Sequence, residues 1–404
     1  MNDQSAIDSA LSRGVVEVIG EDELRKLLAG GKPLRLKMGF DPTAPDIHFG
    51  HVVGLRKLRQ FQDMGHTVVL IIADWTARIG DPSGQSVTRP MLTAEQVKAN
   101  AETYLVQFFK VVDKARTEVR WQSEWFADFS LTDVVELTSR FTVAQFLARE
   151  DFSERFKNQK PIAITEFLYP LLQAYDSVMV KADVEFGGTD QKFNLLVGRD
   201  LQGMMAQRPQ NCLLVPILPG TDGVRKMSKS LNNYIGVDEP PADMYGKTMS
   251  LPDELVGTFF ELLTDVPDSE VASIKATIEA GATNPMDLKK RLARTLVMTF
   301  YDEATADESQ ANFERTVQAG QAPEDVPEVS LPPLADRQGK RLSAFLVDAG
   351  LAGSGADAKR LIEQRAVSLD GTVLESNITS DGLTEGVLKV GKRQFARLIE
   401  AVEP

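Results

Sequence analysis

The sequence predicts an α/β fold built on a parallel sheet in its first half, followed by a helical region and a small α+β tail. Residues 34–40 alternate apolar side chains with others, which is the pattern of a strand. Residues 52–61 carry an apolar side chain at every third position, as one face of a helix does. Residues 68–73 form a continuous apolar run, as expected of a strand that is buried on both faces. A strand, a helix and a strand in this order form a βαβ unit, which points to a parallel sheet of Rossmann type.

Composition bounds the class of protein and the number of domains. The chain has 404 residues, of which 43% are hydrophobic and 25% are charged, so we expect a globular protein of two or three domains. No apolar run approaches the roughly 20 residues that a membrane helix needs, and the first residues lack the pattern of a signal peptide. These features predict a cytoplasmic protein with no membrane partner.

The cysteine count and the charge exclude further classes. Cys212 is the only cysteine, which excludes an intrachain disulfide and a multi-cysteine zinc site, and no metal-binding residue is assigned. The net charge of −13 argues against wholesale coating of nucleic acid, although local basic patches can still bind RNA.

The turn after the first predicted strand carries two of the three histidines. Residues 41–46 form a turn with two prolines, and His48, Gly50 and His51 follow it directly. Both histidines are therefore predicted at a helix N-terminus, at the mouth of an open α/β sheet, where ligands bind. Helix N-termini favour phosphate groups, and a glycine there lets a nucleotide approach the backbone closely. We interpret this junction as functional, the alternative being a structural pair of histidines.

A second polar cluster lies far downstream at 225–230, where the sequence reads Arg-Lys-Met-Ser-Lys-Ser. A turn-rich stretch at 219–223 precedes it, so we expect a mobile loop. Lys226 and Lys229 are three residues apart, so both ammonium groups can reach one anionic ligand. For such a pair alone, the ordinary interpretation is a solvated basic loop.

Together, the two clusters resemble the paired signatures of class I aminoacyl-tRNA synthetases, HIGH and KMSKS, with Phe49 in place of the isoleucine. Two further stretches resemble tyrosyl-tRNA synthetases of the bacterial type, and this resemblance covers nearly the whole chain. Tyr169, Gln173 and Asp176 lie at helical spacing on one face, and a glycine-rich stretch, G-G-T-D-Q, occupies 187–191. Tryptophanyl enzymes share the fold, but a carboxylate at 176 can accept a phenol O–H and fits the tyrosine enzymes better.

The resemblance assigns roles to the matching residues. The implied catalytic residues are Thr43, His48, His51, Lys226 and Lys229. The implied ATP-binding residues are Gly50, Gly188, Asp190, Met227, Ser228 and Lys229. The implied tyrosine-binding residues are Asp41, Asp81, Tyr169, Gln173, Asp176 and Gln191. In this set Asp176 would receive the phenol hydroxyl, and Asp81, Tyr169 and Gln173 would hold the α-ammonium group.

The implied reaction attaches tyrosine to tRNA(Tyr) in two steps. The carboxylate of L-tyrosine attacks the α-phosphate of ATP and pyrophosphate leaves; the tyrosyl group then passes to the terminal adenosine of the tRNA. A carboxylate is already ionised at pH 7, so no general base is required. The site must instead supply positioning and positive charge. Mg²⁺ is implied by ATP rather than by any cluster of ligands in the sequence.

One position departs from the family pattern. Many bacterial tyrosyl enzymes carry a tyrosine four residues before the aspartate of their Asp-Pro-Thr sequence, as a second partner of the phenol. Here Lys37 occupies that position, four residues before Asp41. The resemblance therefore implies no second phenol contact at this position, and Asp176 would act alone or through water.

The remaining boundaries follow from composition and from the resemblance. We predict a Rossmann catalytic domain at 1–225, with a helical, aromatic-rich insertion at about 121–165. In the family this region makes the dimer, so we expect a homodimer. Residues 226–321 would hold the signature loop and a helical domain on the anticodon side, and the prolines of 322–337 indicate a linker.

Residues 338–404 show the order helix, helix, hairpin, with Asp370-Gly371 at the predicted tight turn. This order resembles an S4 RNA-binding domain, the alternative being a structural appendage. The residues implied to contact RNA phosphates are Lys340, Arg341, Lys359, Arg360 and Arg365.

Three other assignments share some of these features: a tryptophanyl enzyme, a nucleotidyltransferase with an H-x-G-H motif, and an RNA-binding protein whose catalytic core is inactive. The intact 225–230 sequence and the tyrosine-pocket residues disfavour the last two. Pyrophosphate exchange that depends on one amino acid separates all of them.

Overall fold

The computed structural model describes residues 4–43, 46–82, 93–318, 326–333, 338–391 and 394–400. Contacts between Cα atoms divide the chain into two units, Met1–Tyr301 and Asp302–Pro404. Each unit is described by itself below.

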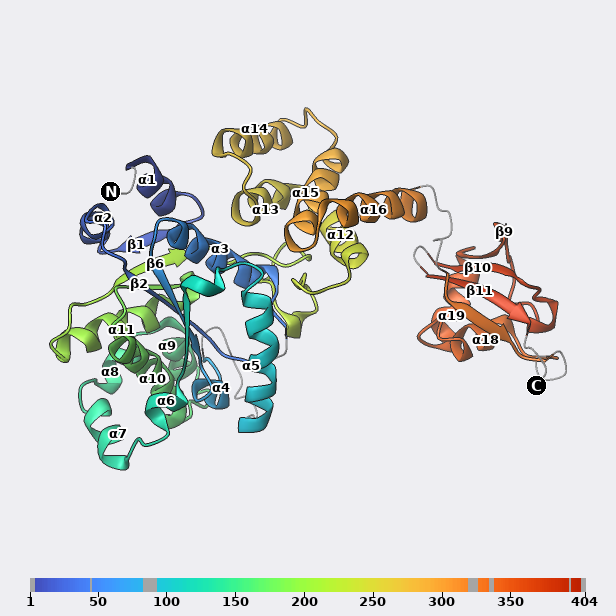
Figure 1. The fold of residues 1–404 in the computed structure, drawn as a ribbon. Coiled ribbons are helices and arrows are strands. Elements are labelled where there is room, and N and C mark those ends of the chain that lie inside the picture. The colour runs from blue at the N-terminus through green and yellow to red at the C-terminus, as the bar shows by residue number, and fades with distance from the viewer. Residues whose placement is uncertain are drawn as a thin grey trace. The chain divides into compact units, whose positions relative to one another are not determined.

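The first unit contains a six-stranded sheet with the order β1-β6-β5-β2-β3-β4 (Figure 1). All neighbours in it are parallel except β1, which runs antiparallel to β6. The predicted α/β class and the two predicted strands are confirmed, because they form the neighbours β2 and β3. The strands are β1 (Glu17–Ile19), β2 (Arg35–Phe40), β3 (Thr67–Ile72), β4 (Thr117–Trp121), β5 (Val184–Gly188) and β6 (Asn211–Val215).

Helices connect these strands, and Figure 1 shows them around the sheet. The helix predicted after the first strand is α3 (Phe49–Asp63), whose apolar face is buried. A long helix, α10 (Ile164–Val180), precedes β5 and packs against α11 (Lys192–Met204). The others are α1 (Gln4–Ser12), α2 (Glu21–Ala29), α4 (Thr76–Ile79), α5 (Ala94–Phe108), α6 (Ser123–Phe126), α7 (Leu131–Thr138), α8 (Val143–Leu147) and α9 (Glu150–Lys157).

The parallel strands decide where a site can form. Their carboxyl ends lie at one edge of the sheet, so the segments that leave β2, β3, β4 and β5 emerge side by side. Those segments carry Asp41, Thr76, Gln122 and Gln191. Ligands bind at this edge in open α/β sheets.

A helical segment completes the first unit, with α12 (Pro241–Met249), α13 (Val256–Leu263), α14 (Asp268–Glu279) and α15 (Pro285–Phe300). The Asn284 side chain caps the start of α15 by accepting a hydrogen bond from Met286 N at 3.1 Å. Along α15, Leu292, Leu296 and Phe300 are buried, and Leu288 is half-buried.

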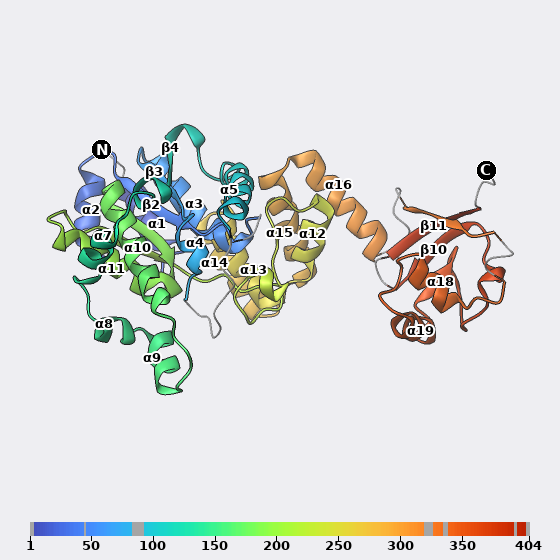
Figure 2. The same cartoon turned by 90° about the horizontal axis from the view of Figure 1, so that it is seen from below.

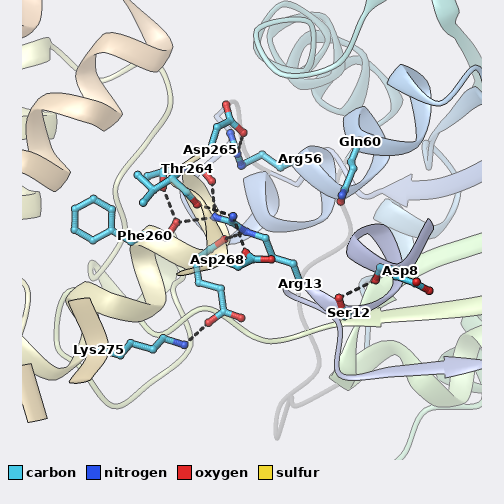
Figure 3. A network of polar contacts seen from close by, with 12 residues as sticks. Asp8, Ser12, Arg13, Arg56, Gln60, Phe260, Thr264, Asp265, Asp268 and Lys275 are labelled. Carbon is cyan, nitrogen blue, oxygen red and sulfur yellow. Dashed lines mark hydrogen bonds and ion pairs between the residues drawn. The ribbon is translucent and has the colours of Figure 1, made fainter. Parts of the chain in front are cut away.

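Figure 3 shows how this segment is joined to the N-terminal residues. The guanidinium group of Arg13 donates to four carbonyl oxygens at and after the end of α13 and pairs with Asp268 at 2.8 Å. The carbonyls at a helix C-terminus have no partner within the helix. Arg13 therefore satisfies these groups from a distant part of the chain.

The second unit begins with α16 (Glu303–Phe313) and contains a five-stranded sheet of order β7-β11-β10-β8-β9. Two helices, α18 (Leu342–Asp348) and α19 (Gly355–Glu363), lie on one face of this sheet, as Figures 1 and 2 both show, and share a buried apolar core with it. The strands are β7 (Glu328–Leu331), β8 (Val367–Leu369), β9 (Thr372–Val373), β10 (Gly386–Val390) and β11 (Gln394–Glu400).

The structure confirms the predicted hairpin turn but differs from the predicted linker. Asp370 and Gly371 join β8 to β9 with positive φ angles of 45° and 82°, as the predicted tight turn requires. However, part of the segment 322–337, predicted as a linker, is strand β7, which pairs in parallel with β11 and buries Leu331. This short strand is flanked by prolines, which hid it in the sequence pattern.

No helix among the described residues is both long and apolar enough to cross a membrane.

Candidate active site

The two signature clusters lie side by side although about 180 residues separate them in the sequence. Phe49 N donates to Ile235 O at 2.9 Å, and Val237 N donates to Ile47 O at 3.0 Å. A methyl group added to Gly50 would lie 3.7 Å from Met227 Cβ and only 2.9 Å from the His48 ring. The backbone after the lysine loop is thus hydrogen-bonded to the tip of α3, and Gly50 leaves no room for a side chain between them.

The two lysines of the loop reach carboxylates on two different strand ends. Lys229 Nζ pairs with Asp46 Oδ2 at 3.0 Å, in the segment after β2. Lys226 Nζ pairs with Asp190 Oδ2 at 3.3 Å, in the 3₁₀ turn after β5. All four side chains are partly exposed. An anion that enters here can take both ammonium groups over from these carboxylates.

The two histidines are neutral hydrogen-bonding groups at pH 7. Burial, followed by the charges of His51, Lys229 and Lys226, lowers the pKa of His48 well below its ordinary value. Removal from water, with the positive charge of Lys229 next, lowers the pKa of His51 to about 4. His48 Nδ1 accepts from Gly50 N at 3.2 Å, and His51 Nδ1 accepts from His48 N at 3.3 Å. In a neutral imidazole the other nitrogen then carries the hydrogen, so each Nε2–H is a donor.

The remaining nucleotide-side residues have the following places. Thr43 N donates to Asp41 O at 2.7 Å within the turn. Ser228 N donates to Asn233 Oδ1 at 2.8 Å, which fixes the start of the signature loop. Gly188 ends β5, where an added methyl group would meet Asp190 Oδ1 at 2.7 Å. Met227 differs from the rest, because its side chain is buried and packs against Gly50 instead of facing an opening.

A second group of polar side chains, from four elements, contains most of the residues that the resemblance implies to bind tyrosine. Asp41 accepts from Tyr169 Oη through Oδ2 and from Thr76 Oγ1 through Oδ1, both at 2.8 Å. Asp81 Oδ2 accepts from Gln191 Nε2 at 2.7 Å. Four of the six residues implied to bind tyrosine are therefore brought together in two hydrogen-bonded pairs.

Asp176 lies deeper and is 1% exposed. Its Oδ2 accepts from Gln122 Nε2 at 2.8 Å and its Oδ1 from Trp125 Nε1 at 3.1 Å. Burial raises the pKa of this carboxyl to about 7, against the lowering effect of the Lys37 charge and of the two donors. Sequence reasoning missed Gln122 and Trp125; their position directly after β4 is the only signal that could have indicated them.

The last of the six residues implied to bind tyrosine is Gln173, which is hydrogen-bonded to Glu185 and Lys37. Its Nε2 donates to Glu185 Oε1 at 3.1 Å, and its carbonyl oxygen accepts from Lys37 Nζ at 2.7 Å. Lys37 is completely buried and points to Glu185, with Nζ at 2.8 Å from Oε1. The residue that departs from the family pattern is thus a buried cation that is paired with a carboxylate of the neighbouring strand.

The five residues implied to bind RNA lie in the second unit. All are exposed, on or next to α18 and α19. Three of these residues form ion pairs. Lys340 lies 3.7 Å from Asp348, Arg365 lies 3.3 Å from Glu375, and Arg360 lies 2.5 Å from Asp357, three residues earlier in the chain.

A mostly parallel sheet with neutral histidines at a helix tip and two lysines near the same edge fits an enzyme that binds a nucleoside triphosphate. The comparisons specify this class. The chain belongs to the family described as tRNA synthetases class I (W and Y), which it matches over residues 29–318. The family predicted from the sequence is confirmed. The alternative assignment, a nucleotidyltransferase of another family, is therefore wrong.

Individual relatives narrow the family further. The chain is 59% identical to a tyrosine–tRNA ligase of Dehalococcoides mccartyi strain CBDB1, over 98% of this chain and 99% of the relative. It is 52% identical to a tyrosine–tRNA ligase of Oleidesulfovibrio alaskensis, over 96% and 97% of the two chains. The fold is similar to that of tyrosyl-tRNA synthetase from Archaeoglobus fulgidus, solved with L-tyrosine. That match has a TM-score of 0.62 and 24% identity, and it covers 76% of this chain and all of the other.

Proposed function

We propose that this chain is a tyrosine–tRNA ligase that forms tyrosyl-adenylate from tyrosine and ATP and then charges tRNA(Tyr). The observation that carries the proposal is the pair of backbone hydrogen bonds that joins the α3 tip to the segment after the lysine loop, while the buried acceptor Asp176 of α10 is bonded to Gln122 at the carboxyl end of β4. ATP is the substrate that the family uses. Because charged tRNA serves translation, a cytoplasmic location belongs to the same proposal.

In the first step the tyrosine carboxylate attacks the α-phosphate in line, and pyrophosphate leaves. Lys226 and Lys229 exchange their carboxylate partners for the β- and γ-phosphates, where negative charge grows. The Nε2–H groups of His48 and His51, with Thr43, donate from the α3 side. No group has to remove a proton, which agrees with histidines that are neutral and hydrogen-bonded in place.

The tyrosine side orients the acid. Asp176 accepts the phenol O–H, and Asp81 with Tyr169 holds the α-ammonium group. Asp41 is bonded to Tyr169 and Thr76, so it fixes the position of this ammonium site from the adenylate side. Gln191 donates to Asp81, and the proposal assigns it to the substrate carboxylate.

Mg²⁺ belongs to the proposal as an ion that arrives with ATP. Within the described residues there is no group of three or more histidine, cysteine or acidic side chains that could hold a metal. Asp46 and Asp190, the carboxylates nearest the lysines, are both engaged in ion pairs. These donors fit a metal that is bound mainly by the triphosphate.

A homodimer is proposed from the apolar surface of the helical insertion. Five large apolar side chains of α7 to α10 are strongly exposed, from 58% to 81%: Leu131, Val135, Val143, Phe156 and Ile164. Large exposed apolar surface is typical of interaction sites, and these five side chains all lie within residues 131–164. Sedimentation equilibrium of the full chain tests this part, and a monomer at micromolar concentration would contradict it.

RNA binding by the second unit rests on its five exposed basic residues. Replacing Lys340, Arg341, Lys359, Arg360 and Arg365 with alanine should leave tyrosyl-adenylate formation unchanged, because none lies in the first unit. The slope of log K for tRNA against log salt should fall by about one for each phosphate contact that is lost. An unchanged slope would contradict RNA contact at these residues.

Amino-acid-dependent ATP–pyrophosphate exchange tests the central proposal. Tyrosine should support exchange, whereas tryptophan and phenylalanine should not at equal concentration. Support by tryptophan would assign the tryptophanyl activity instead. If no amino acid supports exchange while the chain still binds tRNA, it is an RNA-binding protein with an inactive core.

A further inference from the structure

A buried ion pair lies behind the tyrosine side of the site. Lys37 of β2 and Glu185 of β5 are direct neighbours across two parallel strands, and their side chains are 0% and 1% exposed. Lys37 Nζ donates to Glu185 Oε1 at 2.8 Å, to Ser177 Oγ at 2.8 Å and to Gln173 O at 2.7 Å. An ammonium group has three N–H donors, so this cation is fully bonded.

The carboxylate of the pair is equally well bonded. Besides Lys37, Glu185 Oε1 accepts from Gln173 Nε2 at 3.1 Å. Its Oε2 accepts from Ser177 Oγ at 3.1 Å and from Gln210 Nε2. A buried ion pair is commonly no more stabilising than an apolar pair of the same size, because both charges are removed from water. Stability alone therefore does not explain why this pair is present.

The network is attached to the turn of α10 that carries Asp176. Lys37 and Glu185 bond to Gln173 and Ser177, which lie three residues before and one residue after Asp176. The carboxyl group of Asp176 accepts instead from two neutral donors, Gln122 and Trp125. The ion pair thus binds the α10 turn on both sides of the proposed phenol acceptor, through the Gln173 carbonyl and the Ser177 side chain, without a hydrogen bond to the carboxyl group of Asp176.

We propose that Lys37 and Glu185 are positioning residues for tyrosine recognition: they fix the α10 turn around Asp176 and together set the charge of its carboxyl group. This inference rests on the proposed role of Asp176 and extends it to two residues outside the pocket. Lys37 replaces the second phenol partner of many relatives with a charge that acts through Asp176.

The groups that act on Asp176 come from several elements. Burial is the largest cause of the raised pKa of Asp176; the positive charge of Lys37 lowers this pKa and the charge of Glu185 raises it. Gln122 and Trp125 also lower it through their hydrogen bonds. On α10 itself, Tyr169 lies close enough for the charge of Asp176 to raise the tyrosine pKa.

The chemistry gives the direction of each effect. An ionised Asp176 accepts the phenol O–H, whereas a protonated one offers a second donor in its place. Tyrosine binding therefore strengthens as pH rises through the pKa of Asp176, which is about 7. Binding of phenylalanine, which has no hydroxyl, should not follow this titration.

The test compares Lys37→Met, Glu185→Gln and the double variant in the full chain. kcat/KM for tyrosine in pyrophosphate exchange is measured over a pH series on both sides of the inflection, with phenylalanine at high concentration as the second substrate. Lys37→Met should move the inflection to higher pH. On the acidic side of the inflection, kcat/KM for tyrosine should then fall about tenfold for each pH unit that the inflection moves. Glu185→Gln should move the inflection to lower pH, and the double variant should lie between the two.

Opposite movements of the inflection are a result that mere loss of packing cannot give. Lys57→Met is the matched control, because Lys57 is another buried lysine, bonded to Ala10 O, Arg13 O and Gln60 Oε1 on the far part of α3. It should lower thermal stability and leave the inflection in place. Equal loss for tyrosine and phenylalanine with an unmoved inflection, or movement in the same direction in both single variants, would overturn the proposal.

Ser177→Ala keeps the proposal testable if the charge variants do not fold. It removes one acceptor of Lys37 and one donor to Glu185 and leaves both charges in place. KM for tyrosine should rise severalfold with the inflection unchanged, and an unchanged KM would overturn the positioning role. Failure of the proposed function is recognised separately, since the unaltered chain would then show no tyrosine-dependent exchange at all.

Discussion

In the candidate site, the proposed nucleotide side holds its charges at the surface, and the proposed tyrosine side holds them in the interior. Lys226 and Lys229 are partly exposed, and each is paired with one carboxylate from another element. Lys37, Glu185 and Asp176 are buried, and each is bonded to two or more groups of the fold. A phosphate chain can compete for the first set, whereas the second set is fixed before any substrate arrives.

Because of this difference in burial, we expect the two sides to contribute differently to catalysis, specificity and stability. Ion pairs at the surface add little stability, so their residues are free to serve the transition state. Buried polar groups are costly when a partner is lost, so their residues serve specificity and the fold together. Variants on the nucleotide side should therefore change kcat alone, and variants on the tyrosine side should change KM, specificity and stability.

Lys229→Ala should give the largest effect. Removing a preorganised charge that acts on the transition state costs about 10²- to 10³-fold in kcat, and pyrophosphate exchange should fall by that amount. Equilibrium binding of tyrosine and the thermal midpoint should stay within error, because the ion pair with Asp46 is partly exposed.

Lys275→Ala is the matched control, since it removes a comparably exposed pair, with Glu261, outside the site (Figure 3). Its exchange rate should equal that of the unaltered chain. A large loss of tyrosine binding in Lys229→Ala would contradict the claim that the two sides contribute separately to kcat and to tyrosine binding.

Asp176→Asn should give a smaller effect of a different kind. A hydrogen bond to a charged group is worth about 1.5–3 kcal/mol, so kcat/KM for tyrosine should fall by roughly 10- to 150-fold. The rate with phenylalanine should change little, so the preference for tyrosine should fall by the same factor. An unchanged preference would mean that another group accepts the phenol hydroxyl.

The sequence predicted the proposed nucleotide side more completely than the proposed tyrosine side. The reason is how far apart in the sequence the residues of each side lie. The βαβ unit, the α3 tip and the lysine loop are contiguous patterns, and each could be read from neighbouring residues. The donors to Asp176 come instead from the end of β4, about 50 residues earlier, where Gln122 and Trp125 have no local signature.

The partner of Lys37 could not be predicted from the sequence either. It stood out in the sequence as a departure, but its partner Glu185 depends on which strands are neighbours. Strand β7 was hidden for a related reason, since four residues between prolines acquire strand character only through pairing with β11. Contacts that depend on the order of strands in a sheet cannot be found from periodicity.

The last expected effect concerns the pH dependence of stability and comes from the histidines, which belong to the proposed nucleotide side but are buried or partly buried. The pKa of His51 is about 4 in the folded chain, below its ordinary value of 6.5. The unfolded chain therefore binds the extra proton first as pH falls, so this group lowers folding stability progressively between pH 6.5 and 4, by up to about 3 kcal/mol. Above pH 6.5 it contributes no pH dependence.

The His51→Gln variant should therefore lose less stability than the unaltered chain when the pH of urea denaturation is lowered from 7 to 5. At pH 7 its exchange rate should fall, because the Nε2–H donor has moved. Nitrogen-15 NMR of the imidazoles should show His51 protonated at Nε2 and free of titration down to about pH 5, since its pKa is about 4. A His51 that titrates near 6.5 would mean that the tip of α3 is open to water, and that the nucleotide side is not preorganised by the fold at all.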